Sequence, residues 1–277
     1  MEGGSLILIG GAEDKLGKKD ILKKVALDSS KEGKILVVTA ASSLNNEAGE
    51  VYRDIFKDFG IKDINILNVE KRGDGFLKDN IDKVLNSNIV FFTGGDQLRI
   101  TSLLGGTPLY KSFKEAYKRG SAFVGTSAGA SVMSDTMIVS GPDSESPRKC
   151  TVKMAPGLGL INGVIVDQHF AQRGRIGRLL TAVSENPEII GIGIDENTAL
   201  CINKEGIARV IGDGAVYFVD GKNISYTNVS ELHQDDVLSI FNIRMHVLIK
   251  DNKFNLKQRI AYLDQEGINE DKKTKDI

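Results

Sequence analysis

The sequence predicts an α/β fold in which helices cover both faces of a mostly parallel sheet, with antiparallel edge hairpins toward the C-terminus. Short apolar runs alternate with stretches whose apolar residues recur at helical spacing. This is the pattern of buried parallel strands joined by helices. Of the 277 residues, 30 are glycine and only 5 are proline. A glycine content above the usual ~7%, with little proline, indicates tight turns within an ordered fold.

The N-terminal half alternates strands with helices. Strands are expected at the apolar runs of residues 5–9, 34–39, 64–69, 89–92 and 121–125. The first expected helix carries Ile21, Leu22, Val25 and Ala26, which recur at helical spacing. Two further helices are expected at residues 47–59, where apolar residues stand four apart, and at 108–119, where Pro108 suits a first turn.

The C-terminal half changes character. Residues 141–156 are polar and are expected to form a loop, whereas 163–166 and 189–194 are expected to be two more central strands, with a helix over 173–184 between them. Shorter runs at 199–202, 208–211, 216–219 and 245–249 are separated by turn signals, which favours antiparallel hairpins. We expect one α/β domain over residues 1–264 and a charged, frayed tail over 265–277.

The charge balance excludes several function classes. The chain has 36 basic and 37 acidic residues, a formal net charge of −1, so it lacks the global basic field that holds nucleic acid or an anionic membrane. We expect no metal and no cofactor, because the two cysteines lack metal-site spacing. The N-terminus lacks the pattern of a signal peptide, and no apolar run approaches the ~18 residues of a membrane span. These features predict a soluble, cytoplasmic protein.

The segment Gly125-Thr126-Ser127-Ala128-Gly129 matches the G-x-S-x-G pattern. It follows an expected strand and precedes a helical stretch, which is the context of a nucleophile elbow. Such a turn presents the Ser127 hydroxyl above the sheet, and the helix that starts there brings the Ala128 amide toward a developing oxyanion. The alternative is a glycine-rich turn in which Ser127 only caps a helix.

A serine nucleophile needs a base and an orienting carboxylate. Of the three histidines, His169 directly follows an expected strand, whereas His246 lies within a strand-like run and His233 in a polar segment. His169 is therefore the predicted base, since open α/β sheets place their sites at the carboxyl ends of strands. Asp195 and Glu196 both follow the strand at 189–194, and the residues alone do not separate them.

Two further groups of residues are expected near the elbow. Gly94 and Gly95 follow the strand at 89–92, so the Gly95 amide is expected to complete an oxyanion hole and Gln97 to hydrogen-bond substrate; phosphate binding is the alternative. Beyond His169, the guanidinium groups of Arg173, Arg175 and Arg178 suit carboxylates of a substrate. The alternative for these arginines is a solvated helix face.

Five segments together resemble the cyanophycinases, serine peptidases of the peptidase E-like family. They are GGAEDK (10–15), FFTGGDQLRIT (91–101), GTSAGASVMSD (125–135), DQHFAQRGRIGRL (167–179) and GIDENTAL (193–200). The resemblance implies the flavodoxin-like α/β fold shared with class I glutamine amidotransferases. It also implies that Ser127 is the nucleophile, His169 the base and Glu196 the acid.

The substrate that the resemblance implies is cyanophycin, a polyaspartate bearing arginine on each β-carboxyl, cut from its end into β-aspartyl-arginine dipeptides. The positions that match the family's substrate pocket are Gln97, Gln168, Arg173, Arg175 and Arg178. The arginine branches require a carboxylate, and Asp143, Glu145 and Asp167 are the candidates. The resemblance further implies a homodimer. The alternatives are a peptidase E-type α-aspartyl dipeptidase and, from another class, a non-catalytic anion or nucleotide binder.

Overall fold

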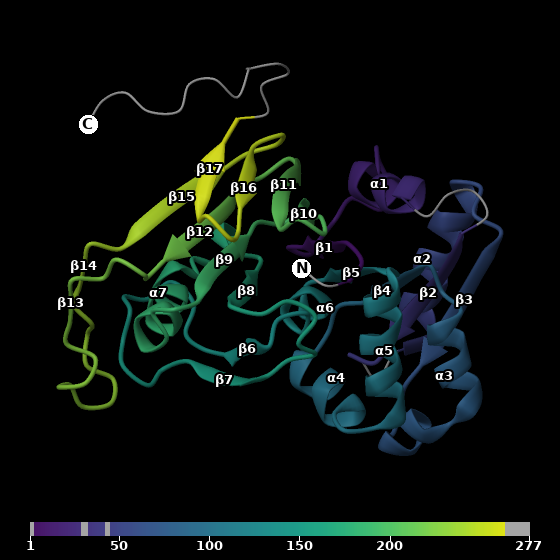
Figure 1. Ribbon diagram of the computed structural model, residues 1–277, viewed down its shortest axis with the longest axis horizontal. Coiled ribbons are helices and arrows are strands. Elements are labelled where there is room, and N and C mark those ends of the chain that lie inside the picture. Colours follow the sequence, from purple (N-terminus) through teal and green to yellow (C-terminus); the bar gives the residue numbers. More distant parts are fainter. Residues whose placement is uncertain (1–2, 29–32, 42–44, 264–277) are drawn as a thin grey trace.

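A nine-stranded sheet forms the centre of the part of the chain that the structure describes (Figure 1). This structure is a computed structural model, which describes residues 3–28, 33–41 and 45–263. The strand order is β17-β16-β11-β10-β1-β5-β4-β2-β3. The parallel strands are β1 (Leu6–Ile9), β2 (Lys34–Thr39), β3 (Asp63–Asn68), β4 (Ile89–Phe92) and β5 (Ala122–Thr126). The predicted α/β class and the parallel core of its sheet are confirmed.

Antiparallel strands extend the sheet on the other side of β1. They are β10 (Thr198–Ile202), β11 (Ile207–Gly212), β16 (Lys253–Asn255) and β17 (Ile260–Tyr262). The hairpin expected at 199–211 is therefore present. The tail expected over 265–277 lies outside the described residues.

Another sheet packs beside the central one, in the order β15-β12-β9-β8. Its strands are β8 (Val164–Gln168), β9 (Ile190–Ile194), β12 (Val216–Asp220) and β15 (Arg244–Leu248), of which only the pair β8–β9 is parallel. The two strands expected at 163–166 and 189–194 are present as β8 and β9, but they belong to this four-stranded sheet and not to the central one. An apolar run specifies burial, but it does not specify which sheet buries it.

Part of the segment expected to be a loop also forms a strand. β6 (Thr136–Ser140) pairs antiparallel with β7 (Lys153–Pro156), so residues 141–152 form the connection between two strands. The run at 153–156 carries a lysine and a proline, which conceal an edge strand from pattern analysis. A short ladder joins β13 (Tyr226–Thr227) to β14 (Ile240–Phe241).

Helices cover both faces of the parallel strands, because successive strand residues point to opposite faces. On one face, α1 (Asp20–Asp28) and α2 (Asn45–Asp58) bury Ile7, Val37 and Phe91 of the strands. On the other face, α3 (Lys78–Leu85), α4 (Gln97–Leu104) and α5 (Pro108–Arg119) share a core with the alternate strand residues and with β8 and β9. The remaining helices are α6 (Ala128–Ser131), α7 (Ile176–Glu185), η1 (Arg72–Phe76) and η2 (Ala171–Arg173).

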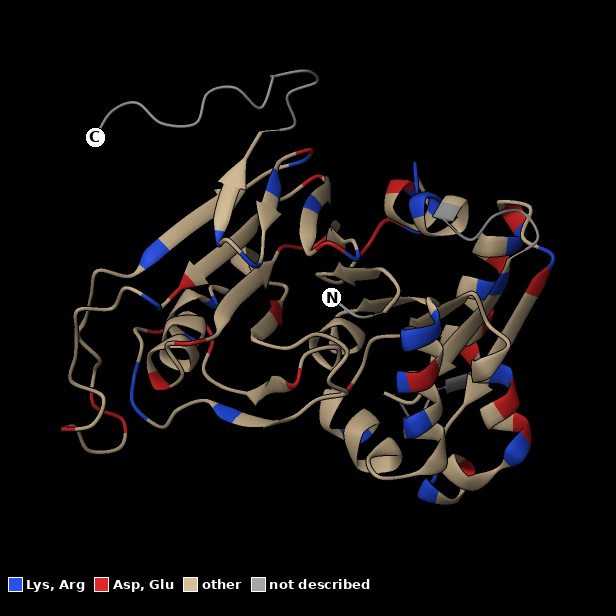
Figure 2. Cartoon of the chain, in the orientation of Figure 1, with Lys and Arg blue, Asp and Glu red and all other residues tan. Residues whose placement is uncertain are grey.

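Acidic and basic residues are interspersed along α2, α3 and α5 in Figure 2. Among the described helices, none combines the length and the apolar character that crossing a membrane would need.

Candidate active site

Ser127 occupies a sharp turn between β5 and α6, with φ 52° and ψ −116°. A side chain on Gly125 would overlap the Gly129 carbonyl, and one on Gly129 would overlap the Phe92 carbonyl. Both glycines are therefore required by close approach of the backbone rather than by flexibility. The strand–turn–helix arrangement expected of a nucleophile elbow is present, with Ser127 in a backbone conformation that non-glycine residues rarely adopt.

Three side chains from three different loops form a hydrogen-bonded series at this turn. The Ser127 Oγ lies 3.0 Å from the His169 Nε2, and the His169 Nδ1 lies 2.6 Å from the Glu196 Oε1. His169 directly follows the end of β8, and Glu196 follows β9. Because α6 contacts both β5 and β8, the series spans the junction of the two sheets.

The geometry distinguishes Asp195 from Glu196, the two candidates for the orienting carboxylate that the sequence did not separate. The Asp195 carboxylate accepts hydrogen bonds from the Ala171 and Ala215 backbone amides, at 2.9 and 3.1 Å, and is turned away from His169. Glu196 faces His169, and its own amide donates to the Gln172 side chain at 3.0 Å. Asp195 therefore joins its own loop to the loops that carry Ala171 and Ala215. Gln172 lies beside the site and was not identified from the sequence.

His233 and His246 take no part in this series. His246 lies on β15, where its ring packs edge-on against Phe254 at 5.6 Å between centroids. The His233 amide donates to Asp236 in a polar loop.

Glycines border the Ser127 and His169 side chains. A side chain on Gly94 would lie 3.4 Å from the Ser127 Cβ, whereas one on Gly95 would overlap the Ala41 carbonyl. The Gly94–Gly95 peptide therefore runs beside the elbow. Gly11, with φ 97°, lies against the His169 imidazole, where a Cβ would overlap the ring. The motif GGAEDK could have revealed Gly11, because it follows a buried strand with two consecutive glycines.

The two glutamines of the predicted pocket are both buried and hydrogen-bonded within the protein. Gln97 Nε2 donates to the Ile138 and Val139 carbonyls at 2.9 and 3.0 Å, which joins α4 to β6. Gln168 Oε1 accepts a hydrogen bond from Arg175. Gln168 immediately precedes His169 and links this histidine's strand to the arginine cluster.

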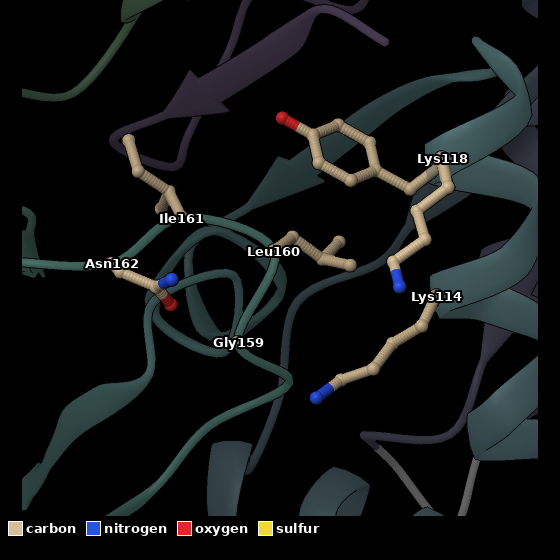
Figure 3. A pocket seen from close by; sticks show the side chains of 7 residues that line it. Lys114, Lys118, Gly159, Leu160, Ile161 and Asn162 are labelled. Atoms are coloured by element: carbon tan, nitrogen blue, oxygen red, sulfur yellow. The ribbon is translucent and has the colours of Figure 1, made fainter. Parts of the chain in front are cut away.

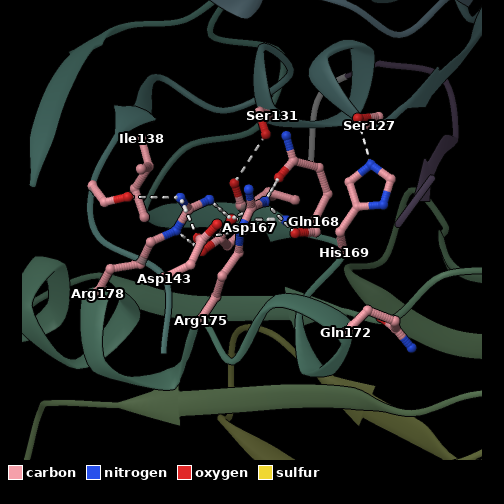
Figure 4. Close-up of polar contacts among 12 residues, drawn as sticks. Ser127, Ser131, Ile138, Asp143, Asp167, Gln168, His169, Gln172, Arg175 and Arg178 are labelled. Atoms are coloured by element: carbon pink, nitrogen blue, oxygen red, sulfur yellow. Dashed lines mark hydrogen bonds and ion pairs between the residues drawn. The ribbon is translucent and has the colours of Figure 1, made fainter. Parts of the chain in front are cut away.

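Arg175 and Arg178 form an ionic cluster with the buried Asp167 and the more exposed Asp143 (Figure 4). Arg178 binds both oxygens of Asp167, through Nε at 2.6 Å and through Nη2. Arg175 Nε donates to the Asp143 Oδ1 at 2.9 Å. The two arginine side chains are 6% exposed and that of Asp167 is 1% exposed, so they form neither a solvated face nor a set of open cations.

The cluster is electrically balanced, because two guanidinium groups face two carboxylates. Burial lowers the pKa of Arg175, with the like charge of Arg178 acting in the same direction and Asp167 opposing both. Arg173 differs from the other two arginines. It is exposed, and among the described residues its guanidinium has no hydrogen-bonding or ionic partner in the structure.

A separate cavity of about 440 Å³ lies between α5 and the loop at residues 159–162 (Figure 3). Lys114 and Lys118 line it together with Tyr117 and Asn162. None of these residues belongs to the Ser127 site. Within the described residues, no group of three or more His, Cys, Asp or Glu side chains could hold a metal ion.

Comparisons with known proteins relate the chain to a peptidase family. Residues 6–210 match the sequence profile of Peptidase family S51. The chain is 42% identical to a cyanophycinase of Geminocystis herdmanii over 255 residues, which cover 91% of this chain and 94% of that protein. It is 38% identical to a cyanophycinase of Thermosynechococcus vestitus over 256 residues, which cover 92% and 80% respectively.

The fold also matches a solved structure. The crystal structure of a peptidase from an acI-B1 Actinobacterium aligns with a TM-score of 0.65 and 24% identity, covering 91% of this chain and 97% of that one. The resemblance predicted from the five motifs is confirmed by these matches: the chain belongs to Peptidase family S51.

Proposed function

We propose that this protein is a serine-type exopeptidase that hydrolyses cyanophycin to β-aspartyl-arginine dipeptides through an acyl-enzyme. The observation that carries the proposal is the hydrogen-bonded series Ser127–His169–Glu196 at the elbow. The curated relatives that match more than nine-tenths of the chain are cyanophycinases, which supports this substrate.

The series acts as a catalytic triad. The Ser127 Oγ attacks the carbonyl carbon of a backbone aspartyl bond while the His169 Nε2 takes the hydroxyl proton. Glu196 accepts the Nδ1 proton in a hydrogen bond, which fixes the imidazole tautomer and stabilises the imidazolium. His169 then gives its proton to the leaving amine, and water hydrolyses the acyl-enzyme with His169 again acting as base.

The developing oxyanion is held by backbone amides. Ala128 is the first residue of α6, so its amide has no carbonyl within that helix to bind. The Gly95 amide lies in the peptide beside Ser127 and is the second donor. Fixed donors of this kind stabilise the tetrahedral intermediate more than the substrate.

Substrate recognition is divided among the predicted pocket residues. The exposed Arg173 guanidinium has no partner among the described residues, so it receives a free carboxylate of the polymer. Arg175, Arg178 and Asp167 are occupied with one another, so they hold Gln168 and the strand that precedes His169 rather than binding substrate themselves. Gln97 likewise fixes β6 at the edge of the site.

The carboxylate for the arginine branch is expected on the loop at residues 141–152. Asp143 and Glu145 have side chains that are 41% and 55% exposed, whereas Asp167 is buried under two guanidinium groups. Asp143 faces the two guanidinium groups of Arg175 and Arg178, at 2.9 and 3.3 Å. Glu145 faces only that of Arg148, at 3.8 Å, so Glu145 carries the more available charge.

The rival function is that of a peptidase E-type α-aspartyl dipeptidase, and the experiment that separates the two compares substrates. Purified protein is incubated with cyanophycin and, separately, with Asp-Leu, and the kcat/KM values are measured. Cyanophycinase activity requires turnover of the polymer with little or none of the dipeptide. The reverse preference would establish the rival.

The quaternary structure and compartment form part of the same proposal. We expect a homodimer in the cytoplasm, built from one catalytic domain per chain. Sedimentation velocity checks the dimer, and a monomer at micromolar concentration would contradict it.

A further inference from the structure

The loop at residues 10–14, in the connection between β1 and α1, hydrogen-bonds to His169 and to chain neighbours of Ser127 and Glu196. The Gly10 carbonyl accepts the His169 amide at 2.8 Å, and the Gly11 carbonyl accepts the amide of Asn197 at 2.9 Å. Asn197 directly follows Glu196. The third contact of this loop, through Glu13, reaches the residue that precedes Ser127.

Glu13 places a carboxylate in the protein interior, behind the elbow. Its side chain is 1% exposed. The Glu13 Oε2 accepts the Thr126 hydroxyl at 2.5 Å, while Oε1 accepts the Tyr52 hydroxyl and lies 3.0 Å from the Lys15 Nζ. Burial together with the Glu13 charge raises the pKa of Tyr52, so this phenol remains a donor.

A buried carboxylate is costly unless every oxygen is satisfied, and replacing such a group by apolar side chains is often neutral for stability. Stability from packing therefore does not explain why a carboxylate is buried at Glu13. A charged acceptor holds a hydroxyl more firmly than a neutral one does. Thr126 is one peptide bond from Ser127, whose backbone conformation is strained and persists only where its surroundings enforce it.

We propose that Glu13 is a positioning residue, which holds the Ser127 elbow in its reactive geometry through the Thr126 hydroxyl. The inference rests on the proposed function, because it takes Ser127 as the nucleophile. Glu13 does not touch substrate. It acts by fixing the backbone from which the Ser127 Oγ reaches His169.

The test measures the reactivity of Ser127 directly. Wild type, Thr126→Val, Thr126→Ser and Glu13→Gln are treated with a fluorophosphonate probe, and the second-order rate of Ser127 modification is followed by mass spectrometry. Steady-state kcat and KM on cyanophycin and the melting temperature are measured in parallel. Glu115→Gln, which removes an exposed ion pair with Arg119, is the matched control for loss of a carboxylate.

Thr126→Val keeps the shape of the side chain and removes the hydroxyl, so it is expected to lower both the labelling rate and kcat about 10- to 100-fold with KM unchanged. Thr126→Ser restores the hydroxyl and is expected to recover most of that loss. Glu13→Gln is expected to follow Thr126→Val, and Glu115→Gln to behave as wild type.

Two failures are distinguishable. A wild-type protein that is not labelled at Ser127 contradicts the proposed function itself. A wild type that is labelled, together with a folded Thr126→Val that is labelled at the same rate, overturns the positioning role alone. If Glu13→Gln does not fold, the Thr126→Val and Thr126→Ser pair still decides the question.

Discussion

Arg178 binds both carboxylate oxygens of Asp167, its Nε at 2.6 Å from Oδ2, in the buried cluster beside His169. Arg173, five positions earlier in the chain, is exposed. Two arginines from one short motif therefore have different roles, and substitution of each should have a different signature.

Arg178→Met leaves the Asp167 charge without its bidentate partner, so we expect the free energy of unfolding to fall by about 3–5 kcal/mol. Arg173→Met should change stability by less than about 0.5 kcal/mol and should lower kcat/KM on cyanophycin about 10- to 150-fold, the value of one charge-assisted hydrogen bond. Chemical unfolding and steady-state kinetics measure the two effects. An Arg173→Met protein with unchanged kcat/KM would remove this arginine from the substrate site.

Gly11→Ala tests the contact between the loop at residues 10–14 and the imidazole of His169, the proposed base. The new Cβ would overlap the His169 ring, and displacement of a catalytic group by about 1 Å costs on the order of 100-fold in rate. Gly60→Ala is the matched control, because Gly60 also has a positive φ, 87°, but nothing lies within 4 Å of a Cβ there. Both variants should lose stability, and only Gly11→Ala should lose activity; equal kcat values for the two would contradict the contact.

Asp14 makes part of the stability dependent on acid pH. Backbone amides of Gly17, Lys19 and Leu16 donate to its carboxylate and lower its pKa from 3.8 to about 2. A carboxyl group whose pKa is lowered by folding contributes stability that is present above its unfolded pKa and is lost as the pH falls through the folded value.

Asp14→Asn should therefore be less stable than wild type at neutral pH, and the difference should shrink between about pH 4 and pH 2. Urea unfolding of both proteins across this range measures it. A difference that is the same at pH 7 and pH 2 would show that the charge on Asp14 is not the cause.

Tyr117 should make part of the stability depend on pH in the alkaline range. Burial raises its pKa to about 12, its side chain is 4% exposed, and its hydroxyl has no hydrogen-bond partner among the described residues. Tyr117→Phe should thus be neutral or more stable by up to about 1 kcal/mol at pH 7. The stability of wild type relative to this variant should fall as the pH rises from about 10 to about 12. A destabilised Tyr117→Phe would indicate a bound partner for this hydroxyl in the cavity of Figure 3.

The sequence predicted well those elements whose signals are local. β2, β4 and α5 begin and end at the predicted residues. α5 has Pro108 in its first turn, with Thr107 as its N-cap, and ends at Gly120 in a left-handed conformation, which are signals that depend on a few neighbouring residues. α3 was missed, although Ile81, Val84 and Leu85 in its segment, KDNIDKVL, recur at helical spacing.

What the sequence could not predict depends on pairing between distant segments. The run at 164–166 is as apolar as β1, and only the pairing of its strand with β9 places it in the other sheet. Asp195 and Glu196 are adjacent in the sequence, so the backbone conformation of their loop decides which carboxylate hydrogen-bonds to His169. The arginine motif indicated charge near the site. It could not indicate the partners of Arg175 and Arg178, which are Asp143, more than thirty residues away in the sequence, and Asp167 on β8.

The proposed function makes Ser127 the nucleophile in the hydrolysis of cyanophycin. Its most direct test incubates insoluble cyanophycin with wild type and with Ser127→Ala and identifies the soluble products by mass spectrometry. We predict β-aspartyl-arginine dipeptides from wild type and a rate lower by at least about 1,000-fold for Ser127→Ala, because nucleophile and base act as a unit. No soluble product from wild type, or near-normal turnover by Ser127→Ala, would contradict the account.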